Sequence, residues 1–291
     1  KMKIAIASGK GGTGKTFVTT NLFYTLQQQG ENITLVDCDA EEPNARLFFD
    51  GKLLETNQVT QRVPVIDEKK CTYCGKCHDY CNYNAIFFLR EAKMIKVMEE
   101  LCHGCGACSV ACEFDAISEK EVILGDVNRY MISDNSWLVE ACMKVGVYSP
   151  VSVIKAAINE ADNGGVALMD SPPGTSCPFI QTVANADLVV LVTEPTPFGL
   201  SDLRQSVETL KTMEKPYGVI INRANLGDDG VDRYLEEEKI PLLMRIPFKR
   251  SIAAVYSRGA LLCEDQPQWQ PRFIRLFKQI TGLYGDSHYQ R

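Results

Sequence analysis

Eight of the 12 cysteines in this chain of 291 residues lie between positions 71 and 112, within a segment that repeats itself. Residues 71–86 match residues 102–117, every corresponding pair is 31 positions apart, and each copy has the spacing Cys-x2-Cys-x2-Cys-x3-Cys. In a reducing compartment, cysteines that lie this close together in the sequence are more often metal ligands than members of disulfides. The segment is therefore predicted to be a small metal-binding module made of two copies of one unit.

The spacing also predicts which cysteines share a metal group. Three thiolates at this spacing bind three irons of a cubane, and the fourth reaches the other cluster in two-cluster ferredoxins. One [4Fe–4S] cluster is expected on Cys71, Cys74, Cys77 and Cys112, and the second on Cys81, Cys102, Cys105 and Cys108.

The module resembles the bacterial 2[4Fe–4S] ferredoxins, which are small α+β domains. It departs from them where a proline usually follows the fourth cysteine, because Asn82 and Glu113 stand there. This leaves ligation intact but bears on cluster potential and local rigidity. Two zinc sites are the competing interpretation, although zinc sites usually use paired Cys-x2-Cys knuckles. His78 and His103, which lie between ligands, are expected to be solvated loop residues.

Outside this module, buried-strand patterns alternate with amphipathic ones. The expected strands are Lys3–Ser8, Ile33–Asp37, Val166–Asp170, Leu188–Thr193, Tyr217–Asn222 and Leu242–Ile246. The expected helices are Thr16–Gln29, Gly199–Met213, Val231–Glu238 and Pro271–Leu283. This alternation predicts an α/β domain with a mostly parallel sheet and right-handed crossovers. Residues 1–62 and 122–291 would form that domain, and residues 63–121 would be the inserted module.

A glycine-rich loop follows the first expected strand and precedes the first expected helix. Glycines let successive backbone N–H groups turn toward phosphate oxygens, and the positive end of the following helix adds to the attraction. Lys15 supplies a charge for the β- and γ-phosphates, and the Thr16 hydroxyl suits Mg²⁺. The residues expected around the phosphates are Gly11, Gly12, Thr13, Gly14, Lys15 and Thr16.

The stretch from Lys10 to Thr16 resembles the deviant Walker A sequence of the MinD/ParA/Mrp ATPases and the nitrogenase iron protein. The resemblance extends over nearly all of the chain outside the module. It implies a P-loop NTPase fold of the SIMIBI, MinD-like class, in which Lys10 reaches across a dimer to the partner's nucleotide. Asp39, in a segment similar to switch I, would orient the attacking water.

The same resemblance implies the other site residues. Asp170 begins a segment similar to Walker B and switch II, and Asp37 would lie near the metal. The expected Mg²⁺ site is Thr16, Asp37, Asp39 and Asp170. The expected adenine pocket is Glu194, Pro195, Asn222 and Arg223. The segment Arg245–Ala260 is also similar to the family, without a role assigned to it.

These features predict a protein that binds ATP and Mg²⁺ and hydrolyses ATP slowly until a nucleotide-dependent homodimer forms. Lys10, Lys15 and Asp39 would be its catalytic residues. Three roles remain open. They are ATP-gated electron transfer through the two clusters, iron–sulfur or metal-cofactor assembly of the Mrp carrier type, and MinD-like positioning that senses redox state. The partner would be a redox protein or an apo-protein acceptor.

Four cysteines lie outside the module. Cys38 and Cys263, in apolar surroundings, are expected to be buried thiols. Cys177 follows Asp170 by seven positions. The nitrogenase iron protein has a cluster ligand at a similar offset and another upstream, in a place comparable to that of Cys142. Cys142 and Cys177 are therefore either ligands of a further cluster between two subunits or two unrelated thiols.

Charge and hydropathy limit the partners. Acidic residues outnumber basic ones, 37 against 31, and the formal net charge of −6 argues against nucleic-acid binding. With no apolar run of membrane-spanning length and no secretory signal, a cytoplasmic location is expected. The amphipathic stretch 271–283 favours a final helix packed on the sheet over a membrane-binding one, although its basic flank leaves membrane contact open.

Overall fold

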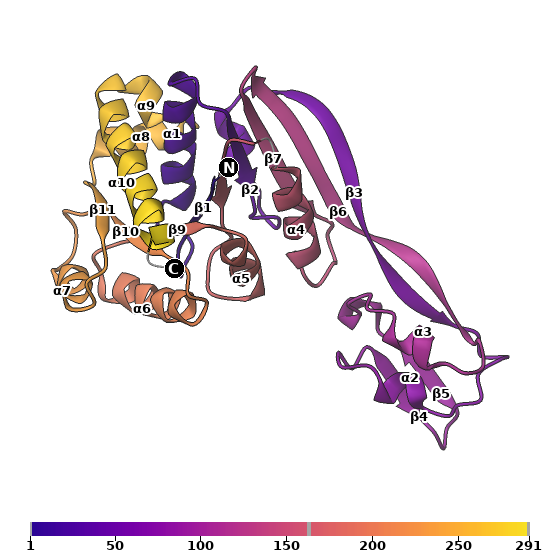
Figure 1. Ribbon diagram of the computed structural model, residues 1–291. Helices are drawn as coiled ribbons and strands as arrows, with labels where there is room; N and C mark the ends of the chain where they lie inside the picture. The colour runs from indigo at the N-terminus through magenta and orange to yellow at the C-terminus, as the bar shows by residue number, and fades with distance from the viewer. Residues whose placement is uncertain (1, 162–163, 290–291) are drawn as a thin grey trace. The chain divides into compact units, whose positions relative to one another are not determined.

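The computed structural model describes residues 2–161 and 164–289, which fall into two compact units (Figure 1). The first unit comprises Lys1–Asn57, Val127–Cys142 and Val151–Arg291, as far as they are described. The second unit comprises Gln58–Asp126 and Met143–Pro150. The glycine-rich loop therefore belongs to the first unit, and the cysteine repeat belongs to the second.

A parallel sheet forms the centre of the first unit. Its strands are hydrogen-bonded in the order β11-β10-β9-β1-β8-β2-β7, and all neighbouring pairs in this series are parallel. Beyond β7 the order continues with β6 and β3. The strands span Met2–Ala7 (β1), Ile33–Asp37 (β2), Ser136–Met143 (β7), Val166–Asp170 (β8), Leu188–Thr193 (β9), Tyr217–Asn222 (β10) and Leu242–Ile246 (β11).

The buried-strand patterns located six of these seven strands, and β7 was not anticipated from the sequence. Five of the six expected strands have the predicted bounds, and the first begins and ends one residue earlier than expected. All residues of β2 and β9 are buried, because a parallel sheet covered by helices on both faces hides every side chain of its inner strands. The mostly parallel α/β fold is confirmed.

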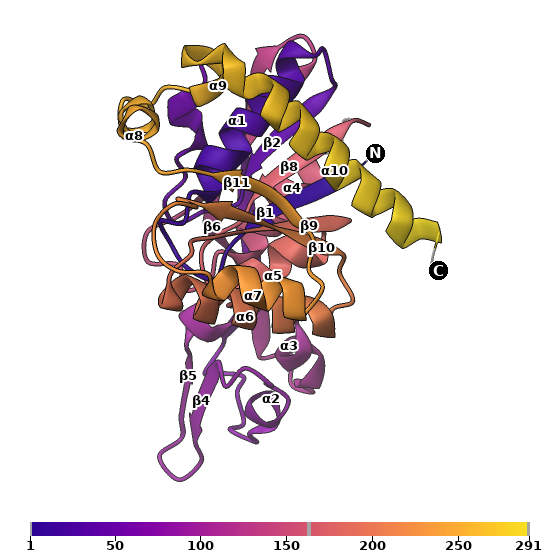
Figure 2. The ribbon, with the colours of Figure 1, turned by 90° about the vertical axis from the view of Figure 1, so that its left-hand side faces the viewer.

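Helices cover both faces of this sheet (Figures 1 and 2). One layer contains α1 (Lys15–Gln28), α8 (Arg250–Ser257), α9 (Leu262–Asp265) and α10 (Gln270–Tyr289). The other contains α4 (Val151–Glu160), α5 (Cys177–Ala184), α6 (Pro197–Thr212) and α7 (Gly230–Glu237). The expected helices correspond to α1, α6, α7 and α10. Single 3₁₀ turns span Ala45–Phe48, Glu99–Leu101 and Pro267–Trp269.

The main core lies between the sheet and the layer that contains α1 and α10. Phe273, Leu276 and Ile280 of α10 are at most 1% exposed and pack into this core. The stretch 271–283 is thus confirmed as part of a helix packed on the domain. Within the described ranges, no helix has the length and apolar character needed to cross a membrane.

The second unit contains the two copies of the cysteine repeat. β3 (Lys52–Ile66) leads into it and β6 (Ile117–Ser133) leads out. Between them lie α2 (Lys76–Asp79), the antiparallel pair β4 (Ile86–Leu89) and β5 (Met94–Val97), and α3 (Ala107–Ala111). The repeat is structural as well: Gly75 and Gly106, 31 positions apart, both have a positive φ directly before a short helix.

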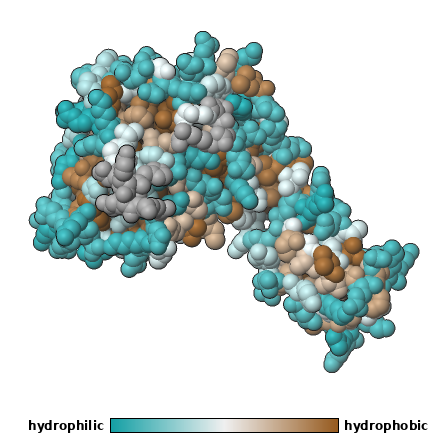
Figure 3. All heavy atoms as spheres, viewed as in Figure 1, coloured by the Kyte–Doolittle hydropathy of each residue, from teal (hydrophilic) through white to brown (hydrophobic). Residues whose placement is uncertain are grey.

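The strands β3 and β6 were not anticipated from the sequence. In β3 only Val63 and Pro64 are buried, so the strand lacks the apolar run by which the inner strands were recognised. The second unit also has a small interior, in which Cys77, Ile86 and Cys108 are its buried cluster. Apolar side chains remain at its surface (Figure 3), among them Tyr80, Phe87, Leu89, Met94, Val110 and Phe114.

Candidate functional site

The glycine-rich loop connects β1 to α1 and is held in one conformation by close contacts. Gly14 has φ 97°, and a Cβ atom there would lie 2.3 Å from Nδ2 of Asn222. That same Nδ2 donates a hydrogen bond of 2.8 Å to the Thr13 carbonyl, so β10 packs directly against the loop. Lys15 begins α1 and is buried. Only glycine fits at position 14, because any side chain would displace Asn222.

Acidic residues from neighbouring strands lie beside the first turn of α1. Asp37 ends β2 and Asp170 ends β8, and the two are paired in register. Asp170 accepts hydrogen bonds from the hydroxyls of Thr16, at 2.6 Å, and Thr19, at 3.2 Å. The Asp37 carboxylate accepts hydrogen bonds of 2.9–3.1 Å from the backbone N–H groups of residues 39, 44 and 45. Two strand ends and a helix thus bring together carboxylate and hydroxyl oxygens.

Burial shifts the pKa values of these groups. Desolvation raises the pKa of Asp37 to about 7 and that of Asp170 to about 6, and each is opposed by hydrogen bonds that the carboxylate accepts. Burial also raises the pKa of Asp39, against the attraction of Lys15. The pKa of Lys15 is lowered by burial, although the three aspartates oppose this. A cluster of buried carboxylates with oxygen donors fits Mg²⁺, whose charge would offset their mutual repulsion.

A hollow of about 790 Å³, which includes space open to solvent, lies beside the glycine-rich loop. It is lined by Gly12, Gly14, Phe17, Asn222, Arg223, Pro247, Phe248, Lys249, Ile252, Ala253 and Tyr256. Apolar and aromatic walls with a few polar groups suit a nucleotide base. Of the expected adenine pocket, Asn222 and Arg223 line this hollow.

The far wall of the hollow differs from the expectation. It consists of residues 247–256, at the end of β11 and in α8, and not of Glu194 and Pro195. The Pro195 carbonyl instead accepts the N–H of Asp228 at 3.0 Å. The sequence contained a signal for this wall, because the segment Arg245–Ala260 was singled out by its likeness to the family, but no chemistry in it indicated a role.

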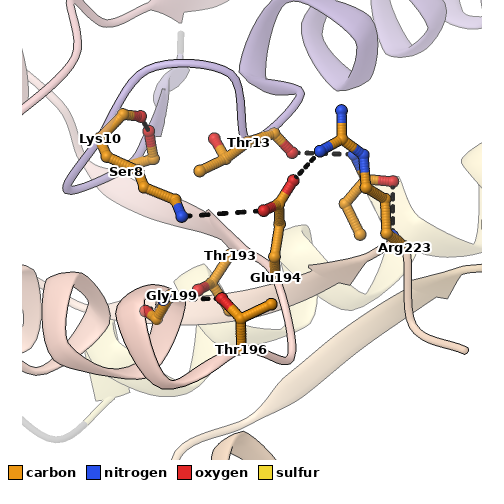
Figure 4. A network of polar contacts seen from close by, with 9 residues as sticks. Ser8, Lys10, Thr13, Thr193, Glu194, Thr196, Gly199 and Arg223 are labelled. Carbon is orange, nitrogen blue, oxygen red and sulfur yellow. Dashed lines mark hydrogen bonds and ion pairs between the residues drawn. The ribbon is translucent and has the colours of Figure 1, made fainter. Parts of the chain in front are cut away.

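Glu194 lies between two basic side chains (Figure 4). Its Oε2 is 3.7 Å from Nζ of Lys10, and its Oε1 accepts a 2.5 Å hydrogen bond from Nη1 of Arg223. The backbone of Lys10 is held by the Ser8 side chain, whose hydroxyl donates a hydrogen bond of 2.6 Å to the Lys10 carbonyl. Lys10 of the glycine-rich loop and Arg223, which lines the hollow of about 790 Å³, therefore share the Glu194 carboxylate.

Each of the two expected cluster sites is a hollow in the second unit with four cysteines in its walls. Cys71, Cys74, Cys77 and Cys112 line one of about 340 Å³. Cys81, Cys102, Cys105 and Cys108 line the other, of about 380 Å³. Each hollow thus takes three cysteines from one copy of the repeat and the fourth from the other copy.

The thiols surround a space and do not meet at a point. Among the described residues, no three His, Cys, Asp or Glu side chains converge as ligands of one metal ion. A tetrahedral zinc ion needs four sulfurs at about 2.3 Å. A group of several atoms fits four thiols spread around a hollow better.

The two histidines of the module are not equivalent. His103 is exposed and stacks on Tyr83, with ring centroids 3.9 Å apart. His78 corrects the expectation of a solvated residue, because it is half-buried and its Nδ1 lies 2.6 Å from the carbonyl oxygen of Ile86. The contact with the Ile86 carbonyl holds the His78 ring against β4.

The remaining cysteines lie in the first unit. Cys38 and Cys263 are fully buried, as expected of plain thiols. Cys177 begins α5 and is exposed. Cys142, near the end of β7, lies 3.4 Å from Glu140, and burial together with that carboxylate raises the pKa of its thiol to about 12.

Known proteins resemble this chain in sequence. Residues 4–262 match the model of the CobQ/CobB/MinD/ParA nucleotide binding domain. An uncharacterized protein of Methanocaldococcus jannaschii is 31% identical over 281 residues, covering 96% of both chains. An iron-sulfur cluster carrier protein of Methanococcus maripaludis is 24% identical over 277 residues, covering 89% of this chain and 77% of the relative.

Solved structures show the same fold. The septum site-determining protein MinD of Pyrococcus horikoshii, complexed with Mg-ADP, superposes with a TM-score of 0.60 at 20% identity. The likeness covers 98% of this chain and 97% of that one. The match to the family model extends from the first strand to the start of α9. It therefore includes the glycine-rich loop, the acidic strand ends and the residues that line the hollow of about 790 Å³. The chain belongs to the CobQ/CobB/MinD/ParA family of nucleotide-binding domains.

Proposed function

We propose that this protein is a Mg²⁺-dependent ATPase whose nucleotide state controls electron transfer through two [4Fe–4S] clusters in the second unit. The observation that carries the proposal is the pair of four-cysteine hollows, each built from both copies of the repeat. Soft thiolate ligands select iron–sulfur clusters or zinc, and the spread of the thiols favours clusters.

The residues of the first unit divide the work of hydrolysis. Backbone N–H groups of residues 11–14 and the Lys15 ammonium bind the phosphates, and Lys10 adds a second charge near the transferred group. Thr16 and Asp170 would hold Mg²⁺, with Asp37 close by, and Asp39 would orient the attacking water. When bound, Mg²⁺ neutralises developing phosphate charge, and the clusters take up and release single electrons.

The ligand assignment can be tested by exchanging one cysteine from each copy. Cys112→Ser should expose Cys71, Cys74 and Cys77 to alkylation under anaerobic conditions while the other set stays protected. Cys81→Ser should do the reverse. Site-resolved alkylation by mass spectrometry, with iron and zinc counting, reads both out. The Cys263→Ala control should match the wild type, because that thiol is buried in the first unit.

The opposite labelling pattern would show that each repeat binds its own group, and stoichiometric zinc would exclude the cluster assignment. The link between nucleotide and clusters needs a second measurement. Electron paramagnetic resonance of the reduced protein should change when Mg–ATP is added. Identical spectra with and without nucleotide would contradict gated electron transfer.

A carrier function is the second candidate. Two relatives of this chain, one from Methanococcus maripaludis and one from Pyrococcus horikoshii, are named iron-sulfur cluster carrier proteins. The two candidates differ in how firmly the clusters are held. A carrier should pass its iron and sulfide to an apo-protein in an ATP-dependent way. An electron-transfer protein should keep eight irons per chain through repeated reduction and oxidation.

A further inference from the structure

The Glu194 carboxylate uses its two oxygens on two cations that come from distant parts of the chain. Oε2 faces Lys10 of the glycine-rich loop at 3.7 Å, and Oε1 binds Arg223 after β10 at 2.5 Å. The Glu194 side chain is 12% exposed, whereas those of Lys10 and Arg223 are 31% and 46% exposed. The carboxylate is therefore the buried member of the group, and both cations reach inward to it.

The backbone holds Glu194 in place. Its carbonyl accepts the N–H of Thr196 at 2.8 Å, and a Cβ atom at Gly199 would come within 2.2 Å of that carbonyl oxygen. The Thr196 hydroxyl in turn caps α6 by accepting the N–H of Gly199 at 3.0 Å. These contacts fix the backbone of the turn between β9 and α6, from which the Glu194 carboxylate extends toward both cations.

The two cations also face different spaces. Arg223 lines the hollow of about 790 Å³ assigned to the base. Lys10 lines a smaller one of about 210 Å³ between the loop and α6, together with Thr13, Thr193 and Asp202. Glu194 stands between them, so whatever draws one cation away changes how strongly the carboxylate holds the other.

We propose that Glu194 is a positioning residue that holds Lys10 against its own subunit and competes with nucleotide phosphates for that lysine. A triphosphate carries more negative charge than one carboxylate, so Lys10 exchanges Glu194 for phosphate when nucleotide binds. The carboxylate lowers nucleotide affinity and keeps Lys10 from acting until phosphate arrives. The inference rests on the nucleotide binding described under the proposed function, and it replaces the role of Glu194 as a wall of the base pocket.

The test is the isosteric change Glu194→Gln, which removes the charge and keeps the shape. Titration calorimetry with Mg–ADP and with inorganic triphosphate should show about three- to fivefold tighter binding of both probes. Glu238→Gln is the matched control, because Glu238 pairs with Lys211 at 2.6 Å on the surface of the same unit. That variant should bind both probes as the wild type does.

A double-mutant cycle with Lys10→Met separates the mechanism from general repulsion of phosphate. In the Lys10→Met background, Glu194→Gln should bring no gain, because the lysine that it releases is missing. Amine labelling gives a readout independent of affinity. Lys10 should react faster in Glu194→Gln than in the wild type, while Lys211 should not change.

Three results would overturn the proposal. They are unchanged affinities in Glu194→Gln, a gain that persists without Lys10, and weaker binding of Mg–ADP with unchanged binding of triphosphate. The last would mean that Glu194 contacts the base. If the wild type bound neither probe, the nucleotide site itself would be wrong and the proposal would fall with it. Binding by the wild type with no effect of the variant would refute only the role of Glu194.

Discussion

At the scale of single residues, the acidic strand ends govern the chemistry of the site. Asp37 and Asp170 are almost completely buried, and they lie beside each other at the carboxyl ends of β2 and β8. Hydrogen bonds from backbone N–H groups and threonine hydroxyls offset only part of the cost of burying two charges. The folded chain therefore binds protons at these positions more tightly than the unfolded chain does.

This predicts a pH dependence that Mg²⁺ reverses. Because both pKa values are raised, from 3.8 to about 7 and about 6, their contribution to stability is complete below about pH 4 and is lost as the pH rises through 6 to 7. Mg²⁺ at the proposed site would bind the deprotonated pair, so stabilisation by Mg–ADP should grow over the same range. Thermal unfolding with and without Mg–ADP from about pH 5 to about pH 8 measures both trends.

Asp170→Asn provides the control for this experiment. It removes one of the two charges, so the loss of stability with rising pH and the gain from Mg–ADP should both become smaller. A wild-type unfolding curve that does not change between these pH values would contradict the pairing of two buried carboxylates.

At the scale of elements, the glycine-rich loop depends on its contact with β10. Gly14 is confined by Asn222, whereas Gly30, just beyond α1, also has a positive φ but would place a Cβ atom with no neighbour within 4 Å. The two glycines share the same backbone requirement, and only one of them has a packing requirement. They therefore form a matched pair for substitution.

Gly14→Ala should destabilise the protein by about 2–3 kcal/mol, because it adds the loss of the Asn222 hydrogen bond to the backbone strain. Gly30→Ala should cost about 1 kcal/mol, from the positive φ alone. Urea unfolding measures both, and calorimetry should show that only Gly14→Ala weakens binding of Mg–ADP. Equal effects of the two changes would mean that the contact between the loop and β10 is unimportant.

At the scale of the whole molecule, the two units differ in what holds them together. The first has an extensive apolar core that includes residues of α1, the sheet and α10. In the second, the buried cluster consists of Cys77, Ile86 and Cys108, with Ile66, Ile95 and Ile117 packed against it. A core this small contributes little by itself, so metal–thiolate bonds would supply much of the stability of the second unit.

Removing the iron of the proposed clusters should therefore affect the units separately. After anaerobic chelation, limited proteolysis should cut within residues 58–126, while binding of Mg–ADP by the first unit stays close to that of the untreated protein. Mass spectrometry of the fragments and calorimetry measure the two effects. Loss of nucleotide binding together with the clusters would show that the units do not fold independently.

Local patterns in the sequence were sufficient for much of this description. The inner strands could be located because apolar runs reflect burial on both faces, and the phosphate loop because its chemistry lies in the consecutive residues 10–16. The sharing of cysteines between the copies follows from spacing as well, and the hollows have that arrangement. In each case the interactions that matter are close together in the chain or repeat at a fixed period.

The tertiary structure decided what depends on contacts between distant segments. β3 is too exposed to have an apolar signal, and residues 247–256 carry no motif that indicates a base-pocket wall. Glu194 was assigned to that wall, yet its partners are residues 10 and 223, from the loop and from the end of β10. A carboxylate in a sequence does not indicate which cation it pairs with. Only the packing of β9 and β10 beside the loop brings the three charges together.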